Sequence, residues 1–202
     1  MFPKNYFQQP RLCLITDRKI VRAIHESPLQ NLTDAVKEAV DAGVDMVQLR
    51  EKDLPSKEYF ELARQTKIIC ERRSALLIIN DRIDIALAVD ADGVHLGWQS
   101  LPFHIARHLL GKEKIIGVST HSKDEAVLAE EKGADYITIP PNYLGEYMNS
   151  PLQIPVFAVG GINENNAGEI IKAGANGIAV ISAILRAEDV KGTVSKIRQS
   201  IL

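Results

Sequence analysis

Short runs of consecutive apolar residues recur along the chain, from Leu12–Ile15 near the start to Ile178–Ile181 near the end. A run of four to six apolar residues without polar alternation is typical of a strand that is buried on both faces. The pattern predicts eight strands, at residues 11–16, 45–49, 76–79, 93–96, 114–118, 135–139, 154–159 and 177–181.

Between these runs, apolar residues return every three or four positions, which predicts helices. The clearest stripe runs from Leu32 to Val40, and Gly43 is expected to end that helix. Further helices are expected at about residues 56–72, 83–89, 102–110, 124–132, 163–172 and 190–201, with another beginning at 182. Residues 1–10 are expected to form an irregular lead-in, residues 19–30 a loop, and residues 140–153 show no clear helical stripe.

Strands that alternate with helices form a parallel sheet. Eight repeats with no run that resembles an exposed edge strand predict a single (β/α)8 TIM barrel over residues 1–202, with a shortened segment after the sixth strand. The chain of 202 residues is short for this fold, which typically has about 250. An open, doubly wound sheet is the alternative.

A sequence repeat supports the regular architecture. Asp41-Ala42-Gly43-Val44-Asp45, Lys132-Gly133-Ala134-Asp135 and Lys172-Ala173-Gly174-Ala175-Asn176 each link a helix to an apolar strand, and Val89-Asp90-Ala91-Asp92-Gly93 is a looser copy. The copies are roughly 40 to 50 residues apart, about two strand–helix units.

Composition narrows the function. Hydrophobic residues make up 46% of the chain and the formal net charge is −2, with no basic run that would favour nucleic acid or an anionic membrane. No apolar run approaches the roughly 20 residues of a membrane span, and no secretory signal is visible, so a cytoplasmic protein is expected. Cys13 and Cys70 lie among apolar residues and are expected to be buried thiols. The oligomeric state stays open, a homo-oligomer included.

Polar residues gather where the predicted strands end, the position of active sites in this fold. Arg50 and Lys52 can neutralise a phosphate, although a solvated charged loop is the simpler alternative. His121 is the best candidate for proton transfer, because imidazole titrates near neutral pH. The residues at the strand ends are Thr16, Asp17, Gln48, Arg50, Lys52, Asn80, Asp81, His95, Trp98, Ser119, Thr120, His121, Gly160, Gly161, Ile181 and Ser182.

The last two of these strand ends predict a phosphate site. Gly160 and Gly161 allow a ligand to approach the backbone, and Ile181 and Ser182 begin a helix with free N–H groups. Loops seven and eight of TIM barrels often bind phosphate. The alternative is that the glycines only form a tight turn. A zinc pair at His104 and His108 has neither a third ligand nor an HExxH pattern, so no metal site is expected.

Taken together, six segments resemble the thiamine phosphate synthase/TenI family of thiamine biosynthesis over nearly the whole chain, and the resemblance implies a (β/α)8 barrel. The segments, in order, are Gln48-Leu49-Arg50-Glu51-Lys52, Asn80-Asp81-Arg82, Ala91-Asp92-Gly93-Val94-His95-Leu96-Gly97, Gly117-Val118-Ser119-Thr120-His121-Ser122, Gly133-Ala134-Asp135-Tyr136 and Val159-Gly160-Gly161-Ile162.

The family has two branches. Synthases couple aminopyrimidine methyl pyrophosphate to thiazole phosphate with Mg²⁺, which an Asp in a Gly-Gln-x-Asp segment helps to hold, and they carry a Thr-x-Thr-Lys loop after strand six. Here Gly97-Trp98-Gln99-Ser100 lacks that Asp, and Pro140-Pro141-Asn142-Tyr143 stands in a shortened loop without Lys.

The resemblance therefore favours the TenI-like thiazole tautomerase branch, an isomerase that aromatises a carboxythiazole phosphate. It implies proton transfer by His121, no metal or other cofactor, and a substrate bound by Gln48, Arg50, Lys52, Asn80, Asp81 and Ser119. Two alternatives remain. One is a thiamine phosphate synthase with an altered metal site, which would need Mg²⁺. The other is a non-catalytic binder of thiazole or thiamine phosphate. The roles of Trp98 and Glu146 are left open.

Overall fold

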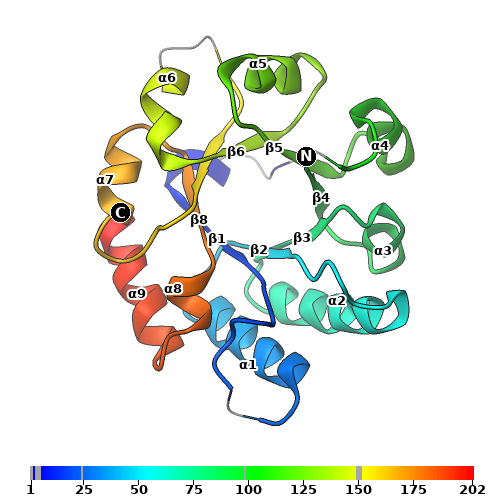
Figure 1. Ribbon diagram of the computed structural model, residues 1–202, viewed down its shortest axis with the longest axis vertical. Coiled ribbons are helices and arrows are strands. Elements are labelled where there is room, and N and C mark those ends of the chain that lie inside the picture. The colour runs from blue at the N-terminus through cyan, green and yellow to red at the C-terminus, as the bar shows by residue number, and fades with distance from the viewer. Residues whose placement is uncertain (1, 3–5, 24, 98, 149–151) are drawn as a thin grey trace.

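A computed structural model describes the chain except for residues 1, 3–5, 24, 98 and 149–151. Within the described residues, eight parallel strands close into a barrel in chain order, with β1 paired to both β2 and β8. The helices surround this ring (Figure 1). The predicted (β/α)8 barrel is confirmed. The strands are β1 (Arg11–Ile15), β2 (Met46–Leu49), β3 (Leu76–Asn80), β4 (Gly93–Leu96), β5 (Ile115–Ser119), β6 (Tyr136–Ile139), β7 (Val156–Val159) and β8 (Gly177–Val180).

The helices follow the predicted stripes closely, and the main differences lie at two starts and in one loop. The helical elements are η1 (Tyr6–Gln8), α1 (Pro28–Asp41), α2 (Ser56–Glu71), α3 (Ile83–Ala88), α4 (Phe103–Leu110), α5 (Lys123–Glu131), η2 (Pro141–Tyr143), α6 (Leu144–Met148), α7 (Ala167–Lys172), α8 (Ser182–Leu185) and α9 (Val190–Ile201).

Helix α1 begins inside the segment predicted to be a loop. The Ser27 side chain accepts a hydrogen bond from the N–H of Gln30, and Pro28 occupies the first turn. A serine cap followed by proline is a helix start signal, because proline has no N–H to leave unsatisfied there. Helix α7 begins at Ala167 rather than 163, because Asn163 and Asn166 bond to backbone groups in the preceding turn. The segment between β6 and β7, where the sequence shows no clear helical stripe, contains η2 and α6.

The side chains of each strand alternate between two cores. Those that point outward, such as Leu12, Val47 and Ile137, pack under the helices. Those that point inward at the amino ends of the strands are apolar and include Met46, Tyr136 and Phe157. Because Phe7 stacks edge-on against Phe157, the lead-in segment covers this end of the barrel. The other end of the interior is therefore the one left for polar groups.

The sequence repeat corresponds to a repeated structural link at the amino end of the barrel. Four residues directly precede the even-numbered strands, and the side chain of each accepts the N–H of a residue at the start of the preceding odd-numbered strand. They are Asp45, Asp92, Asp135 and Asn176. We call these four residues the rim acceptors. Their distances to the N–H groups of Leu12, Leu77, Ile116 and Val156 are 2.8, 2.8, 2.8 and 2.9 Å.

The backbone pairs in the same places, since the N–H of each rim acceptor donates to the carbonyl oxygen of the residue that it binds. Two residues before each acceptor, the chain leaves a helix with positive φ, at Gly43, Gly133 and Gly174. The looser copy has Asp90 in that conformation, with φ of 50°. Four equivalent turns thus deliver the even-numbered strands in register.

The rim acceptors predict an order of stabilities. In Asp92→Ala, the N–H of Leu77 loses its side-chain partner, and we expect the free energy of unfolding to fall by about 1–3 kcal/mol. Asp92→Asn keeps an acceptor and loses only the partly exposed ion pair with Lys67, so a loss below about 1 kcal/mol is expected. Urea unfolding measures the stability of both variants. Glu61→Ala, at an exposed position of α2, is the control. Equal losses for the two Asp92 variants would contradict this account.

Candidate active site

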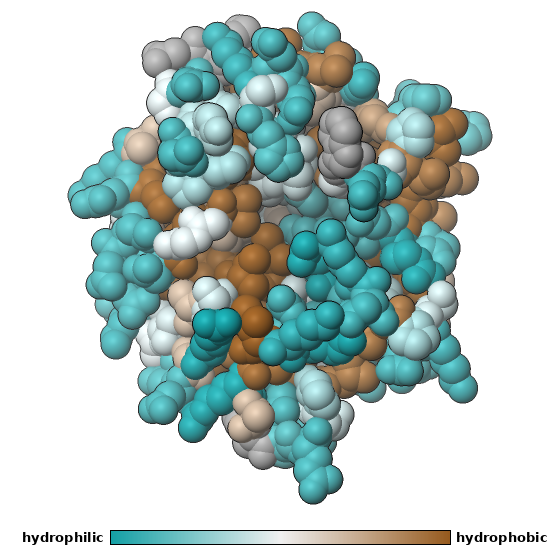
Figure 2. Space-filling view, viewed as in Figure 1, coloured by the Kyte–Doolittle hydropathy of each residue, from teal (hydrophilic) through white to brown (hydrophobic). Residues whose placement is uncertain are grey.

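The carboxyl ends of the strands form the mouth of the barrel, and its lining is polar on one side. Inward-pointing residues at the mouth are Gln48, Asn80, His95, Ser119 and Thr138 on β2 to β6, but Val159 on β7 and Ile181 beyond β8. Gln48, His95 and Thr138 are buried. Figure 2 shows a hollow near the centre of this face, with hydrophobic residues along one flank and hydrophilic ones along the other. The lining of the mouth therefore suits a ligand that has both polar and apolar parts.

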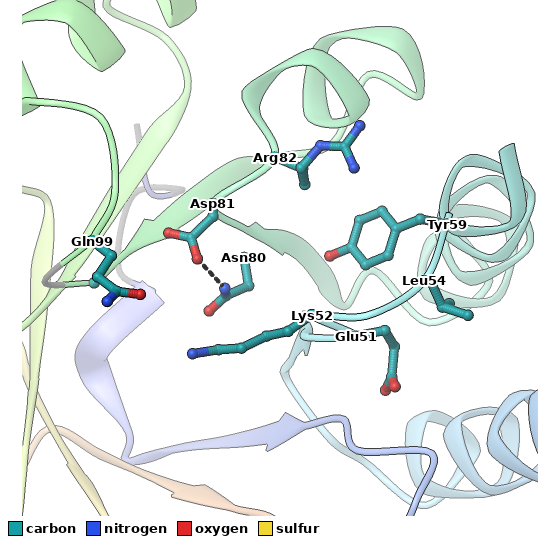
Figure 3. A pocket seen from close by; sticks show the side chains of 9 residues that line it. Glu51, Lys52, Leu54, Tyr59, Asn80, Asp81, Arg82 and Gln99 are labelled. Carbon is teal, nitrogen blue, oxygen red and sulfur yellow. Dashed lines mark hydrogen bonds between the residues drawn. The ribbon is translucent and has the colours of Figure 1, made fainter. Parts of the chain in front are cut away.

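A pocket of about 450 Å³ opens between the loops that follow β2, β3 and β4 (Figure 3). Its walls include Lys52, Tyr59, Asn80, Asp81 and Gln99. In the close-up, the Lys52 side chain extends toward Asn80, whereas Glu51 and Arg82 point away from it. Of the substrate-binding residues predicted from the sequence, Lys52, Asn80 and Asp81 line this pocket, Gln48 bonds to Asn80, and Arg50 precedes the lining residue Glu51 in the chain.

Amide and carboxylate groups at the strand ends form one chain of hydrogen bonds. Gln48 Nε2 donates to Asn80 Oδ1 at 3.0 Å, and Asn80 Nδ2 donates to Asp81 Oδ2 at 2.7 Å. The other Asp81 oxygen accepts from the Ser100 hydroxyl, which itself accepts the N–H of Gly97. Asp81 has φ of 62°, a left-handed conformation that is uncommon outside glycine and often found at functional sites.

Two cationic side chains at this mouth have no counter-ion within the described part of the chain. Among the described residues, neither the Arg50 guanidinium nor the Lys52 ammonium has a hydrogen bond or an ion pair. The neighbouring Glu51, by contrast, is buried, accepts the Thr16 hydroxyl at 2.8 Å and pairs with Arg18 at 3.1 Å. Sequence reasoning treated Glu51 only as part of a charged loop. Its burial anchors the loop that carries Arg50 and Lys52, which leaves both cations available to an anionic ligand.

The predicted phosphate residues lie across the mouth from this pocket, after β7 and β8 (Figure 1). Gly160 and Gly161 have φ of 117° and 63°, and Asn166 Nδ2 donates to the Gly161 carbonyl at 2.9 Å. Ile181 precedes α8 and Ser182 is its first residue, so the first-turn N–H groups have no partner within the helix. Gly161 and Ser182 line one open pocket, as the sequence predicts for neighbouring loops.

His121 lies two residues beyond β5, apart from the Asp81 pocket. Its side chain is 66% exposed. The imidazole Nδ1 is 3.6 Å from a Glu125 carboxylate oxygen, and the backbone N–H of His121 donates to the same oxygen. It lines a separate, mainly apolar groove with Leu96, Leu101 and Ser119. Of the residues left open, Glu146 is exposed on α6 and Trp98 lies outside the described residues.

The side chain of His95 is buried in the barrel interior and bonds to two hydroxyl groups. Its Nε2 lies 2.8 Å from Ser119 Oγ, and its Nδ1 lies 3.0 Å from Tyr136 Oη. Burial lowers the pKa of His95 to about 4, with the Asp81 carboxylate opposing the shift and the Arg50 guanidinium adding to it. The ring is therefore neutral at neutral pH. The sequence suggested a hydrogen-bonded barrel residue here, but only the structure identifies Tyr136 as its partner.

Such a site, at the carboxyl end of a (β/α)8 barrel and facing glycine turns, is typical of enzymes that bind phosphorylated ligands. A family profile described as thiamine monophosphate synthase matches residues 12–146 and 142–184. The chain belongs to the thiamine phosphate synthase/TenI family, which confirms the family resemblance.

Individual relatives are named for the synthase reaction. The chain is 43% identical to a thiamine-phosphate synthase from Syntrophomonas wolfei, over 93% of this chain and 94% of the relative. It is 45% identical to a thiamine-phosphate synthase from Clostridium acetobutylicum, over 90% of each. The solved structure of thiamine phosphate pyrophosphorylase from Pyrococcus furiosus matches with a TM-score of 0.87 and 36% identity, over 98% of both chains.

These relatives overturn the isomerase interpretation. The expectation of a thiazole tautomerase rested on Ser100, on the short loop after β6 and on the position of His121, and it is wrong. A substrate phosphate and water can supply most Mg²⁺ ligands, so the serine at position 100 is compatible with a Mg²⁺-dependent reaction. Among the described helices, none is long and apolar enough to span a bilayer.

The neutral His95 ring predicts a pH dependence of stability. In the unfolded chain the ring takes up a proton below about pH 6.5, whereas in the folded barrel it stays neutral down to about pH 4. Protons therefore favour the unfolded state in this window, and stability falls as the pH drops. At roughly 1.4 kcal/mol per pH unit, His95 contributes up to about 3 kcal/mol of this loss.

Denaturant unfolding of the natural protein and of His95→Gln between pH 4 and pH 7 measures this contribution. The variant has no titrating ring, so its stability should fall less steeply with decreasing pH. Parallel curves for the two proteins would show that His95 does not titrate as its burial requires.

Proposed function

We propose that this chain is a thiamine phosphate synthase. Such a transferase moves the aminopyrimidine, attached through its methyl carbon, from pyrophosphate to thiazole phosphate. The observation that carries the proposal is 43–45% identity to proteins of that name over nine-tenths of both chains. The geometry of the mouth supports it, because Arg50 and Lys52, which have no ion pair among the described residues, lie across the mouth from the glycine turns after β7.

In this proposal the two phosphorylated substrates bind on opposite sides of the mouth. Arg50 and Lys52 bind the pyrophosphate, and the N–H groups near Gly160, Gly161, Ile181 and Ser182 bind the thiazole phosphate. Gln48 retains an amide oxygen and one N–H beyond its bond to Asn80, a pair that complements the ring nitrogen and amino group of an aminopyrimidine. The bond between the methyl carbon and pyrophosphate breaks, the pyrophosphate takes the bonding electrons, and the thiazole bonds to that carbon.

The residues present fit a Mg²⁺ ion only as a site that relies on the substrate. Among the described residues, no three His, Cys, Asp or Glu side chains gather to hold a metal. Asp81 offers one carboxylate and Ser100 a hydroxyl beside it, and Mg²⁺ is commonly held by one or two carboxylates plus substrate phosphates. When bound, the ion would neutralise charge on the departing pyrophosphate. Asp81 would hold the ion, and its left-handed backbone would direct the carboxylate into the mouth.

The proposal predicts that the purified protein forms thiamine phosphate from the two substrates, and only when Mg²⁺ is present. Chromatography of the product measures this. Lys52→Ala should lower the rate by about 10- to 100-fold, because one charge-assisted contact to the pyrophosphate is lost. Lys57→Ala is the matched control, because Lys57 lies in the first turn of α2 and borders a different pocket, next to α1. Binding of thiazole phosphate without any product would instead identify a non-catalytic binder.

A second prediction concerns the missing carboxylate. Ser100→Asp places a second carboxylate beside Asp81, where the two negative charges repel each other until a cation binds. The Mg²⁺ concentration for half-maximal rate should therefore fall by roughly ten-fold. Asp81→Asn should raise it by at least as much. If neither variant changes the Mg²⁺ requirement, the metal is not held at Asp81.

A further inference from the structure

Four buried or half-buried polar side chains form a connected path through the barrel interior, from Tyr136 to the mouth. Tyr136 Oη is 3.0 Å from His95 Nδ1, and His95 Nε2 is 2.8 Å from Ser119 Oγ. Thr138 Oγ1 donates to the same serine oxygen at 3.3 Å. These residues come from the neighbouring strands β4, β5 and β6. Ser119 is half-buried and points inward at the mouth, two residues beyond Gly117, which is the register partner of His95, and His95 in turn is the register partner of Asn80. It is the member of the path that borders open space at the mouth.

The hydrogen-bond partners of Tyr136 and His95 determine which atoms carry the hydrogens. A neutral imidazole has one N–H and one acceptor nitrogen. Tyr136 is 1% exposed, and among the described residues its hydroxyl has one hydrogen-bond partner, His95 Nδ1. If Nδ1 carried the hydrogen, the phenol hydrogen would be buried without an acceptor, which costs free energy. The phenol therefore donates to Nδ1, and the imidazole hydrogen sits on Nε2.

The serine oxygen is then occupied on both lone pairs. One accepts the Nε2–H of His95 and the other accepts the Thr138 hydroxyl. The serine's own hydrogen is the one group left over, so Ser119 can act only as a donor to a further partner. Arg50 directly follows β2 at the same mouth, and its guanidinium has no ion pair among the described residues, so a positive charge lies at this end of the barrel. A donor beside a cation suits an anionic oxygen.

We propose that Tyr136 and His95 are positioning residues that fix Ser119 as a hydrogen-bond donor to a substrate pyrophosphate oxygen. The identity of that ligand rests on the proposed function, whereas the direction of the hydrogen bonds does not. Neither Tyr136 nor His95 touches the substrate. Their effect on binding passes through the serine hydroxyl.

The first test reads the hydrogen positions directly, without any substrate. Nitrogen NMR of the ¹⁵N-histidine-labelled protein at pH 7 should show His95 as the neutral form with its hydrogen on Nε2. A hydrogen on Nδ1, or a charged ring, would overturn the proposal. Because no turnover is involved, this result is independent of synthase activity.

The second test is a double-mutant cycle with inorganic pyrophosphate as the probe, measured by calorimetry with Mg²⁺. Ser119→Ala should weaken binding by about 10- to 100-fold, as expected for loss of a bond to a charged group. Tyr136→Phe, which keeps the ring, should weaken it by several-fold in the natural background and not at all together with Ser119→Ala. Tyr6→Phe removes another interior phenol hydroxyl, far from the mouth, and is the control.

Additive losses from Tyr136→Phe and Ser119→Ala would mean that the tyrosine affects binding independently of the serine, and would overturn the positioning role. Pyrophosphate binding that is unaffected by Ser119→Ala, or absent from the natural protein, would overturn the ligand assignment. If pyrophosphate binds as expected but no thiamine phosphate forms, the proposed function fails while this inference stands.

Discussion

The barrel depends on a bond made once in every two strand–helix units, between a rim acceptor and the N–H at the start of the preceding strand. The amide that is bound belongs to the second residue of β1, β3 and β5 and to the first residue of β7. Burial of such a group without a partner is costly. Three of the acceptors are aspartates, each with a basic partner: Arg11 and Arg198 for Asp45, Lys67 for Asp92, and Arg107 for Asp135. The fourth, Asn176, carries no charge, so the essential property is the acceptor oxygen.

Register at the amino end determines chemistry at the carboxyl end. Once the strands are aligned there, the inward-pointing positions fall into layers, with aromatic rings at one end and amides, hydroxyls and an imidazole at the other. The Gln48–Asn80–Asp81 chain and the His95–Ser119 pair cross from strand to strand. A shift of one residue in any strand would turn its polar group outward into the helical layer.

The barrel could be predicted from the sequence because the spacing of apolar residues shows which positions are buried. Continuous apolar runs indicated the strands, and apolar residues at every third or fourth position indicated the helices. Sequence reasoning also found most residues at the mouth, because polar groups that end apolar runs are unusual. It missed the start of α1, where Ser27 and Pro28 were taken for a loop, and the buried role of Glu51, because a charged residue in a charged run gives no sign of burial. The branch of the family was misjudged from Ser100 because substitution at one ligand position does not reveal how much of the coordination the substrate supplies.

The pairing of Gly117 with Tyr136 restricts which amino-acid substitutions either position can accept. The two residues are register partners on β5 and β6, and a Cβ on the glycine would overlap the tyrosine ring. The ring fills the interior, and its hydroxyl meets His95 only because the neighbouring position is bare. Descendants of this chain can alter either residue only by passing through a clash or a void, so the two are expected to be inherited together as a single unit.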